Sequence, residues 1–216
     1  MLNTRTNALH TGEIMKKIMF CLICSYLLGS LNPSALIARI KHTNLRKKGT
    51  KNLGATNVML NFGKVLGALV MLFDLFKAFF AVKLAAYLVP EHAWLPLLAG
   101  CIAVVGHIFP FYLKFKGGKG LAAYGGMVLG VSGWIFLFLL LLCSVLMLIS
   151  NYSLTLVVSA AVLFPLLVTL KSGGNLIVLT ISVLISALLI FKFRENFTKI
   201  KNGEELRVRD YLKSKK

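Results

Sequence analysis

Acidic residues are scarce in this chain, which has 7 Asp and Glu against 25 Lys and Arg among its 216 residues. Charged residues of both signs make up only 15% of the sequence, while 57% of the residues are hydrophobic and the mean hydropathy is +0.79. A soluble domain needs far more surface charge, so the composition indicates an integral membrane protein. The apolar runs do not alternate polar and apolar residues, which excludes membrane strands and favours helices.

Cysteine is also sparse, with four residues that all lie inside apolar runs. Cys21 and Cys24 form a C-x-x-C pair, but no second pair or nearby histidine accompanies them. Zinc sites need four such ligands, so we expect no metal and read these cysteines as small apolar side chains.

The excess of basic residues gives a formal net charge of +18 and lies next to the hydrophobic runs. Cations in that position bind anionic lipid headgroups and orient the helices in the membrane. We therefore expect membrane lipids as partners and no nucleic acid.

The apolar runs predict a single integral membrane domain over residues 1–216, an all-α polytopic helix bundle. Residues 1–14 form a polar extension and residues 194–216 a cytoplasmic tail. Dividing residues 121–150 into a short and a longer helix gives seven spans with the N-terminus outside and the C-terminus cytoplasmic. An alternative of five spans counts residues 121–150 once and treats residues 153–193 as one tilted span. The other expected spans are Ile18–Ile40 (interrupted near Gly29–Pro33), Gly63–Val89 and Ala93–Leu113.

A glycine-rich, cationic segment, Lys114–Gly120, follows the third of these spans. We call it the glycine loop. Glycines allow backbone N–H groups to converge on an anion, and lysines add charge. It is not a nucleotide-binding P-loop, because Leu113 stands where that motif has glycine and Gly120 where it has Ser or Thr. The remaining alternatives are a shaped phosphate site and a solvated basic turn.

A second candidate anion site lies in the first polar loop, residues 39–64, which we call the first loop. It has seven basic residues and no acidic one. Asn52, Thr56 and Asn57 stand beside Gly49 and Gly54 and could line a phosphate oxygen. Ordinary turn chemistry would explain the same residues.

Asp74, Lys77 and His107 are ionisable side chains within the expected spans. Asp74 and Lys77 are three residues apart on one helix face, which favours a buried structural ion pair over a polar site. His107 lies near the end of its span, where it could brace a loop or act as a base.

In combination, these segments resemble the acyl-phosphate:glycerol-3-phosphate acyltransferase family. The matching segments run in order from about Ser25 to Glu205. They are Gly29-Ser30, Gly49–Val58, Asp74-x-x-Lys77, Gly106–Pro110, Lys116–Gly120 and Arg194-Glu195-Asn196 with Gly203 and Glu205. The resemblance implies a seven-helix bundle in the bacterial cell membrane with its active site on the cytoplasmic side. It also implies acyl transfer from acyl phosphate to glycerol 3-phosphate, giving lysophosphatidic acid and phosphate without cofactor, acyl-CoA or metal.

The resemblance and the residue patterns together give the predicted site. The catalytic residues are Thr50, Lys119 and Asn196, and the structural residues are Asp74, Lys77 and Glu205. The substrate-binding residues are Lys51, Asn52, Gly54, Thr56, Asn57, His107, Gly117, Gly118 and Gly120.

The sequence departs from the family pattern at four positions. Thr50 stands where the family usually has serine, Lys51 where it has glycine, Leu60 where it has arginine and Phe193 where it has histidine. Losing an arginine that pairs with phosphate could cost roughly 2–4 kcal/mol of binding, which Lys51 or Lys64 could offset. A catalytically weakened paralogue that binds phosphate-bearing lipid precursors is therefore an alternative. A transporter is disfavoured, because the later spans are nearly all aliphatic.

Overall fold

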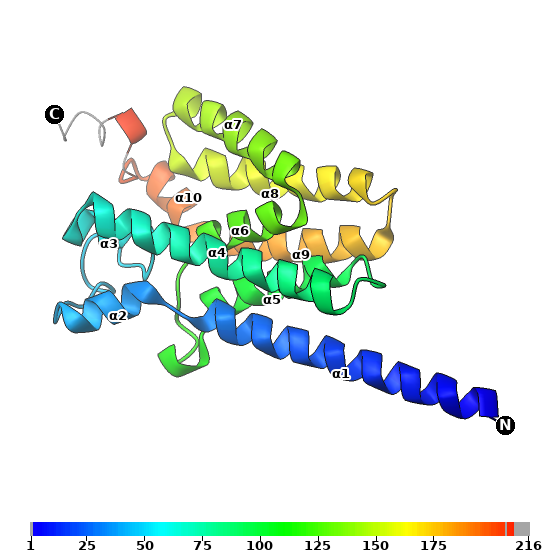
Figure 1. Cartoon of the computed structure of the whole chain (residues 1–216). Coiled ribbons are helices and arrows are strands. Elements are labelled where there is room, and N and C mark those ends of the chain that lie inside the picture. The colour runs from blue at the N-terminus through cyan, green and yellow to red at the C-terminus, as the bar shows by residue number, and fades with distance from the viewer. Residues whose placement is uncertain (1, 206, 210–216) are drawn as a thin grey trace. The chain divides into compact units, whose positions relative to one another are not determined.

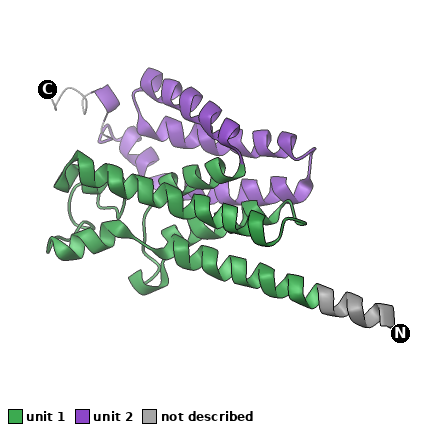
Figure 2. Cartoon of the chain, in the orientation of Figure 1, with its two compact units in different colours: residues 1–131 green, residues 132–216 purple. Residues whose placement is uncertain are grey.

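The computed structural model describes residues 2–205 and 207–209, and every regular element in these residues is a helix (Figure 1). The chain forms two compact units, residues 1–131 and residues 132–216 (Figure 2). Five helical segments are long and apolar enough to cross a membrane, and a pair of helices bent by 44° could add a sixth. The all-α membrane fold is confirmed, while seven crossings and the orientation of the termini stay predictions.

The first unit is built around one long helix. Its elements are α1 (Leu2–Ser30), α2 (Pro33–Ile40), α3 (Ala55–Phe62), α4 (Lys64–Leu88), α5 (Leu95–Ile108), the 3-10 turn η1 (Phe111–Leu113) and α6 (Leu121–Val131). The central helix, α4, packs against α1, α3, α5 and α6, and α1 also packs along α5. Side chains on α4 can therefore reach several neighbouring elements at once.

The break between α1 and α2 confirms the interruption expected near Gly29–Pro33. The Asn32 side chain accepts a hydrogen bond from the Ala35 amide at 2.9 Å, and Pro33 occupies the first helical position. An asparagine cap followed by proline is a strong start signal, so the chain begins a new helix here. The break also leaves backbone groups of α1 available to other partners.

Close packing of α1 on α5 depends on two glycines. A Cβ atom on Gly29 would lie 2.1 Å from the Ala103 carbonyl oxygen, and one on Gly106 would lie 2.5 Å from the Tyr26 carbonyl oxygen. Only glycine permits this approach of the two backbones. Because His107 follows Gly106, the approach places the histidine beside the break in α1–α2.

Residues 121–150 divide as expected into a short and a longer helix. α6 has 11 residues, which span about 16 Å and cannot cross a bilayer alone. The division falls at Ser132, whose hydroxyl caps the next helix.

The second unit contains α7 (Gly133–Ser150), α8 (Ser153–Lys171), α9 (Leu176–Lys192) and α10 (Arg194–Lys201). α8 packs against both α7 and α9. Gly173 and Gly174 have φ angles of +69° and +82°, and the Asn175 side chain caps α9. Residues 153–193 therefore form two helices separated by a turn, and not the single span of the five-crossing alternative.

Candidate functional site

A buried ionic cluster joins α4 to α5 and to the helix break. Lys77 Nζ lies 2.7 Å from Asp74 Oδ1, 2.9 Å from His107 Nδ1 and 2.6 Å from the Leu31 carbonyl oxygen. All three side chains of the cluster are less than 5% exposed. The expected Asp74–Lys77 pair is therefore present, and His107 contacts both of its residues.

The Lys77 ammonium group has three N–H donors and three acceptors within hydrogen-bond distance. If each donor serves one acceptor, His107 Nδ1 accepts and the imidazole carries its proton on Nε2. The 3.2 Å approach of His107 Nδ1 to Asp74 Oδ1 then reflects two acceptors that share one ammonium group. In this tautomer the Nε2 edge of the ring is a donor.

Tyr112 of η1, shortly after the end of α5, contacts the same break. Its hydroxyl donates to the Ser30 carbonyl oxygen at 2.8 Å and accepts from the Asn32 amide at 3.0 Å. Backbone groups freed by the break are thus satisfied by Tyr112 and Lys77. A role for Tyr112 was not predicted from the sequence, although Pro110 and the lysines close to it belong to segments that were.

The first loop is folded around the side chain of Asn57, which is 1% exposed. Its amide nitrogen donates to the carbonyl oxygens of Leu45 (2.8 Å) and Asn52 (2.9 Å), and its Oδ1 accepts from the Thr50 amide (3.0 Å). Asn61 Nδ2 donates to the same Oδ1 atom at 3.0 Å. Asn57 therefore shapes the loop from inside, while substrate contact by it stays a prediction.

Lys51 adopts a left-handed backbone conformation with φ +58° and is exposed. This region is costly for a side chain with a Cβ atom and is open to glycine. The conformation accounts for glycine at this place in the family pattern. It also means that the lysine is held here at an energetic cost.

The glycine loop is attached to the end of α5 through its own amides. The Gly117 amide donates to the Ile108 carbonyl oxygen at 3.0 Å, and the Gly118 amide donates to the His107 carbonyl oxygen at 3.2 Å. These two N–H groups are therefore used within the protein. The prediction that both glycines bind substrate stays a prediction, and their visible role is to let the loop lie close to α5.

The glycine loop also lies directly against the first loop. A Cβ atom on Gly118 would be 2.2 Å from His107 Nε2 and 2.7 Å from the Leu53 carbonyl oxygen. The Arg46 guanidinium group donates to the Lys116 carbonyl oxygen, which is a second link between the loops. Segments about 65 residues apart in sequence thus form one surface beside His107.

The lysines of the glycine loop differ in exposure. Lys119 is half-buried, whereas Lys114 and Lys116 are exposed. Thr50, Asn52 and Gly54 are half-buried and Thr56 is exposed. In the first unit, the structure brings Gly118 against His107 and against Leu53, which lies between Asn52 and Gly54. That the other predicted residues share this site stays a prediction.

Two predicted residues, Asn196 and Glu205, lie in the second unit and contact each other. Asn196 Nδ2 donates to Glu205 Oε1 at 2.7 Å, which links α10 to the segment after it. Phe193, at the turn between α9 and α10, is buried. The structural role predicted for Glu205 agrees with this contact, while substrate contact by Asn196 stays a prediction.

These features define a helical membrane protein with two basic loops that meet at a buried polar centre. Residues 19–203 match the family model described as glycerol-3-phosphate acyltransferase. The chain belongs to that family.

Known relatives agree with this assignment. The chain is 35% identical to the glycerol-3-phosphate acyltransferase of Streptococcus thermophilus (strain CNRZ 1066), over 88% of this chain and 92% of the relative. It is also 35% identical to the glycerol-3-phosphate acyltransferase of Aquifex aeolicus (strain VF5), over 88% of this chain and 99% of the relative.

Two crystal structures of PlsY (YgiH), an integral membrane glycerol 3-phosphate acyltransferase, are similar in fold. The glycerol 3-phosphate form has a TM-score of 0.81 and 35% identity, and the lysophosphatidic acid form has a TM-score of 0.78 and 34% identity. Each comparison covers 88% of this chain and 94% of the solved chain.

We predict that Lys77→Met destabilises the protein by about 3–5 kcal/mol, because it leaves a buried Asp74 carboxylate without its cation. Lys83→Met is the matched control, since Lys83 is exposed on the same helix. Thermal unfolding in detergent would measure both changes. Similar melting temperatures for the two variants would contradict the structural role of the Lys77 cluster.

Proposed function

We propose that this protein transfers a fatty acyl group from acyl phosphate to glycerol 3-phosphate, producing lysophosphatidic acid and inorganic phosphate. The proposal rests on family membership and on the junction of two basic loops at one place in the first unit. The first loop and the glycine loop contain no acidic residue, so a doubly charged phosphate would meet only cations and neutral donors there. The reaction would form a precursor of membrane phospholipids.

The chemistry needs little from the protein beyond positioning and charge neutralisation. A hydroxyl oxygen of glycerol 3-phosphate attacks the acyl carbonyl carbon, and the bond between that carbon and the phosphate oxygen breaks. Phosphate leaves with the electron pair, and the hydroxyl proton passes to a phosphate oxygen. Because phosphate is a good leaving group, no serine or cysteine nucleophile is required.

Lys119 is the residue best suited to neutralise phosphate charge. It is the half-buried lysine of the glycine loop and follows Gly118, which lies against both His107 and Leu53. A lysine whose side chain is already restricted binds an anion more tightly than a fully solvated lysine, because it loses less conformational entropy on binding. His107 would support this position from beneath the loop with its Nε2 donor.

The basic loops favour the cytoplasmic side of a bacterial cell membrane as the location of the site. Lys and Arg accumulate in cytoplasmic loops, and the turn Pro90–His92 at the far end of α4 has no Lys or Arg. The first loop, the glycine loop and the tail after α9 would then share one side.

A catalytically weakened family member is the second candidate. Leu60 lies on α3 with 37% of its surface exposed, and Phe193 is buried. Neither side chain can pair with phosphate. The variant tests below distinguish weakened activity from replacement of the missing cation by another residue.

Purified protein supplied with acyl phosphate and glycerol 3-phosphate should release phosphate and form lysophosphatidic acid. We expect Lys119→Ala to lower kcat/KM for glycerol 3-phosphate by about 100-fold, which corresponds to about 2.7 kcal/mol. Lys114→Ala is the control and should change it less than about threefold. Equal effects of the two changes would mean that the loop is a diffuse basic patch.

Lys51→Gly tests whether this lysine replaces the missing arginine. The change should leave stability unaltered or raise it by up to about 1 kcal/mol, because it removes the left-handed side chain. It should lower phosphate release, and Lys51→Gly with Leu60→Arg should restore it. Lys48→Gly, an equivalent change in the same loop, is the control.

Full activity of Lys51→Gly in an active enzyme would exclude compensation by this lysine. If wild-type turnover is low and Leu60→Arg alone raises it, the result would instead support the hypothesis that this protein is a catalytically weakened family member. Both outcomes are read from the same phosphate-release measurement.

A further inference from the structure

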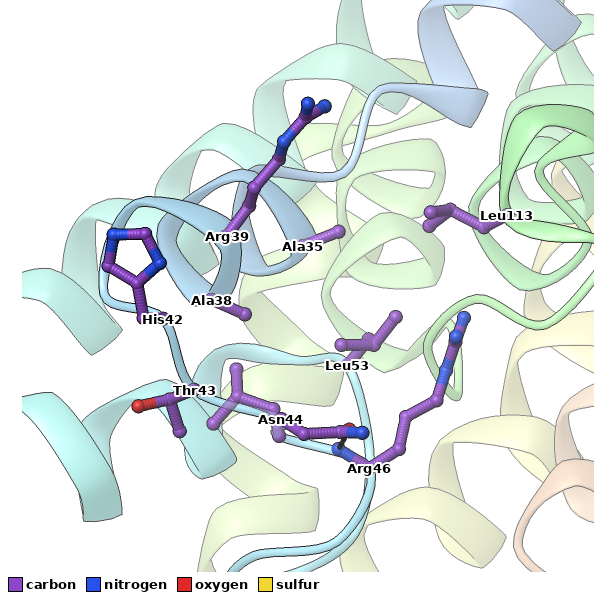
Figure 3. A pocket seen from close by; sticks show the side chains of 10 residues that line it. Ala35, Ala38, Arg39, His42, Thr43, Asn44, Arg46, Leu53 and Leu113 are labelled. Atoms are coloured by element: carbon purple, nitrogen blue, oxygen red, sulfur yellow. Dashed lines mark hydrogen bonds between the residues drawn. The ribbon is translucent and has the colours of Figure 1, made fainter.

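A groove of about 480 Å³ lies beside α2 in the first unit (Figure 3). Its apolar part is formed by Ala35 and Ala38 of α2, Leu45 and Leu53 of the first loop, and Leu113 of η1. Arg39 and Arg46 also line it, and both side chains are exposed. The groove thus combines an apolar wall with two guanidinium groups.

The groove lies where two membrane-spanning segments end. The segment Thr11–Ile40 ends with the helix turn that carries Ala38 and Arg39, and the segment Leu95–Leu113 ends at Leu113. Residues at the ends of spanning segments lie at the level of the lipid headgroups. The groove would therefore lie at the depth where phospholipid phosphates are found.

The side chains that line the groove match the phosphate group of a phospholipid and the apolar part next to it. Guanidinium groups bind phosphate through paired N–H donors, and every charged residue that lines the groove is basic. The five apolar residues would contact the glycerol and the upper part of an acyl chain. A free phosphate ion would leave those apolar residues without a partner.

We propose that this groove binds an anionic phospholipid of the bilayer, with its headgroup held by the arginines that line the groove, Arg39 and Arg46. The proposal does not depend on the acyl transfer proposed above. Arg46 also donates to the Lys116 carbonyl oxygen of the glycine loop. A lipid bound here would therefore stabilise the arginine that links the first loop to the glycine loop.

The test uses the full chain purified in a neutral detergent and titrated with phosphatidylglycerol, with bound lipid counted by native mass spectrometry. Arg39→Gln with Arg46→Gln should weaken phosphatidylglycerol binding by at least about tenfold. Lys41→Gln with Lys47→Gln is the matched control, because it removes the same charge from exposed positions nearby that do not line the groove. It should change binding less than about threefold.

Arg39→Gln alone leaves the contact of Arg46 with the glycine loop intact. This single variant can therefore be measured if the double variant does not fold. It should still weaken binding several-fold. Equal weakening in the groove and control variants would overturn the proposal in favour of a diffuse basic surface. Unchanged binding in both groove variants would overturn it, and so would displacement of the lipid by millimolar inorganic phosphate or by acyl phosphate.

Discussion

The first unit depends on the Lys77 ammonium group and its three acceptors. An isolated charge inside a membrane bundle is costly, so the acceptors must be held in place around it. They come from α4 itself, from the break between α1 and α2, and from α5. One ammonium group therefore fixes the relative positions of the three elements from which the first loop and the glycine loop depart.

This constraint explains why two basic loops can form one surface. His107 belongs to the buried cluster through Nδ1, and its Nε2 edge lies against the Cα atom of Gly118. The Leu53 carbonyl oxygen approaches the same glycine from the first loop. The polar interior of the bundle is thus continuous with the surface on which we place the phosphate site.

Much of this organisation could be predicted from the sequence. The apolar runs identified the apolar helices, whereas α3 and α10 lie in segments predicted as a polar loop and a tail. Gly29–Pro33 and the glycines near Ser132 marked the breaks, because Pro and Gly act locally on the backbone. The Asp74–Lys77 pair followed from helical spacing.

Other features depend on contacts between distant segments, which spacing does not encode. Three features are of this kind: the hydrogen bonds of Tyr112, the link between Arg46 and Lys116, and the contact of His107 with the ion pair. The internal use of the Gly117 and Gly118 amides also could not be predicted, because a glycine-rich sequence does not show where its N–H groups point. Three glycines in seven residues would be equally compatible with an open phosphate cradle.

The central claim is that the two loops form a single phosphate site, and amide hydrogen exchange with and without glycerol 3-phosphate tests it most directly. The account predicts that the ligand protects residues 49–57 and 114–120 together, and that Lys119→Ala abolishes the protection of both. Protection confined to one loop, or protection of both that survives Lys119→Ala, would contradict the account.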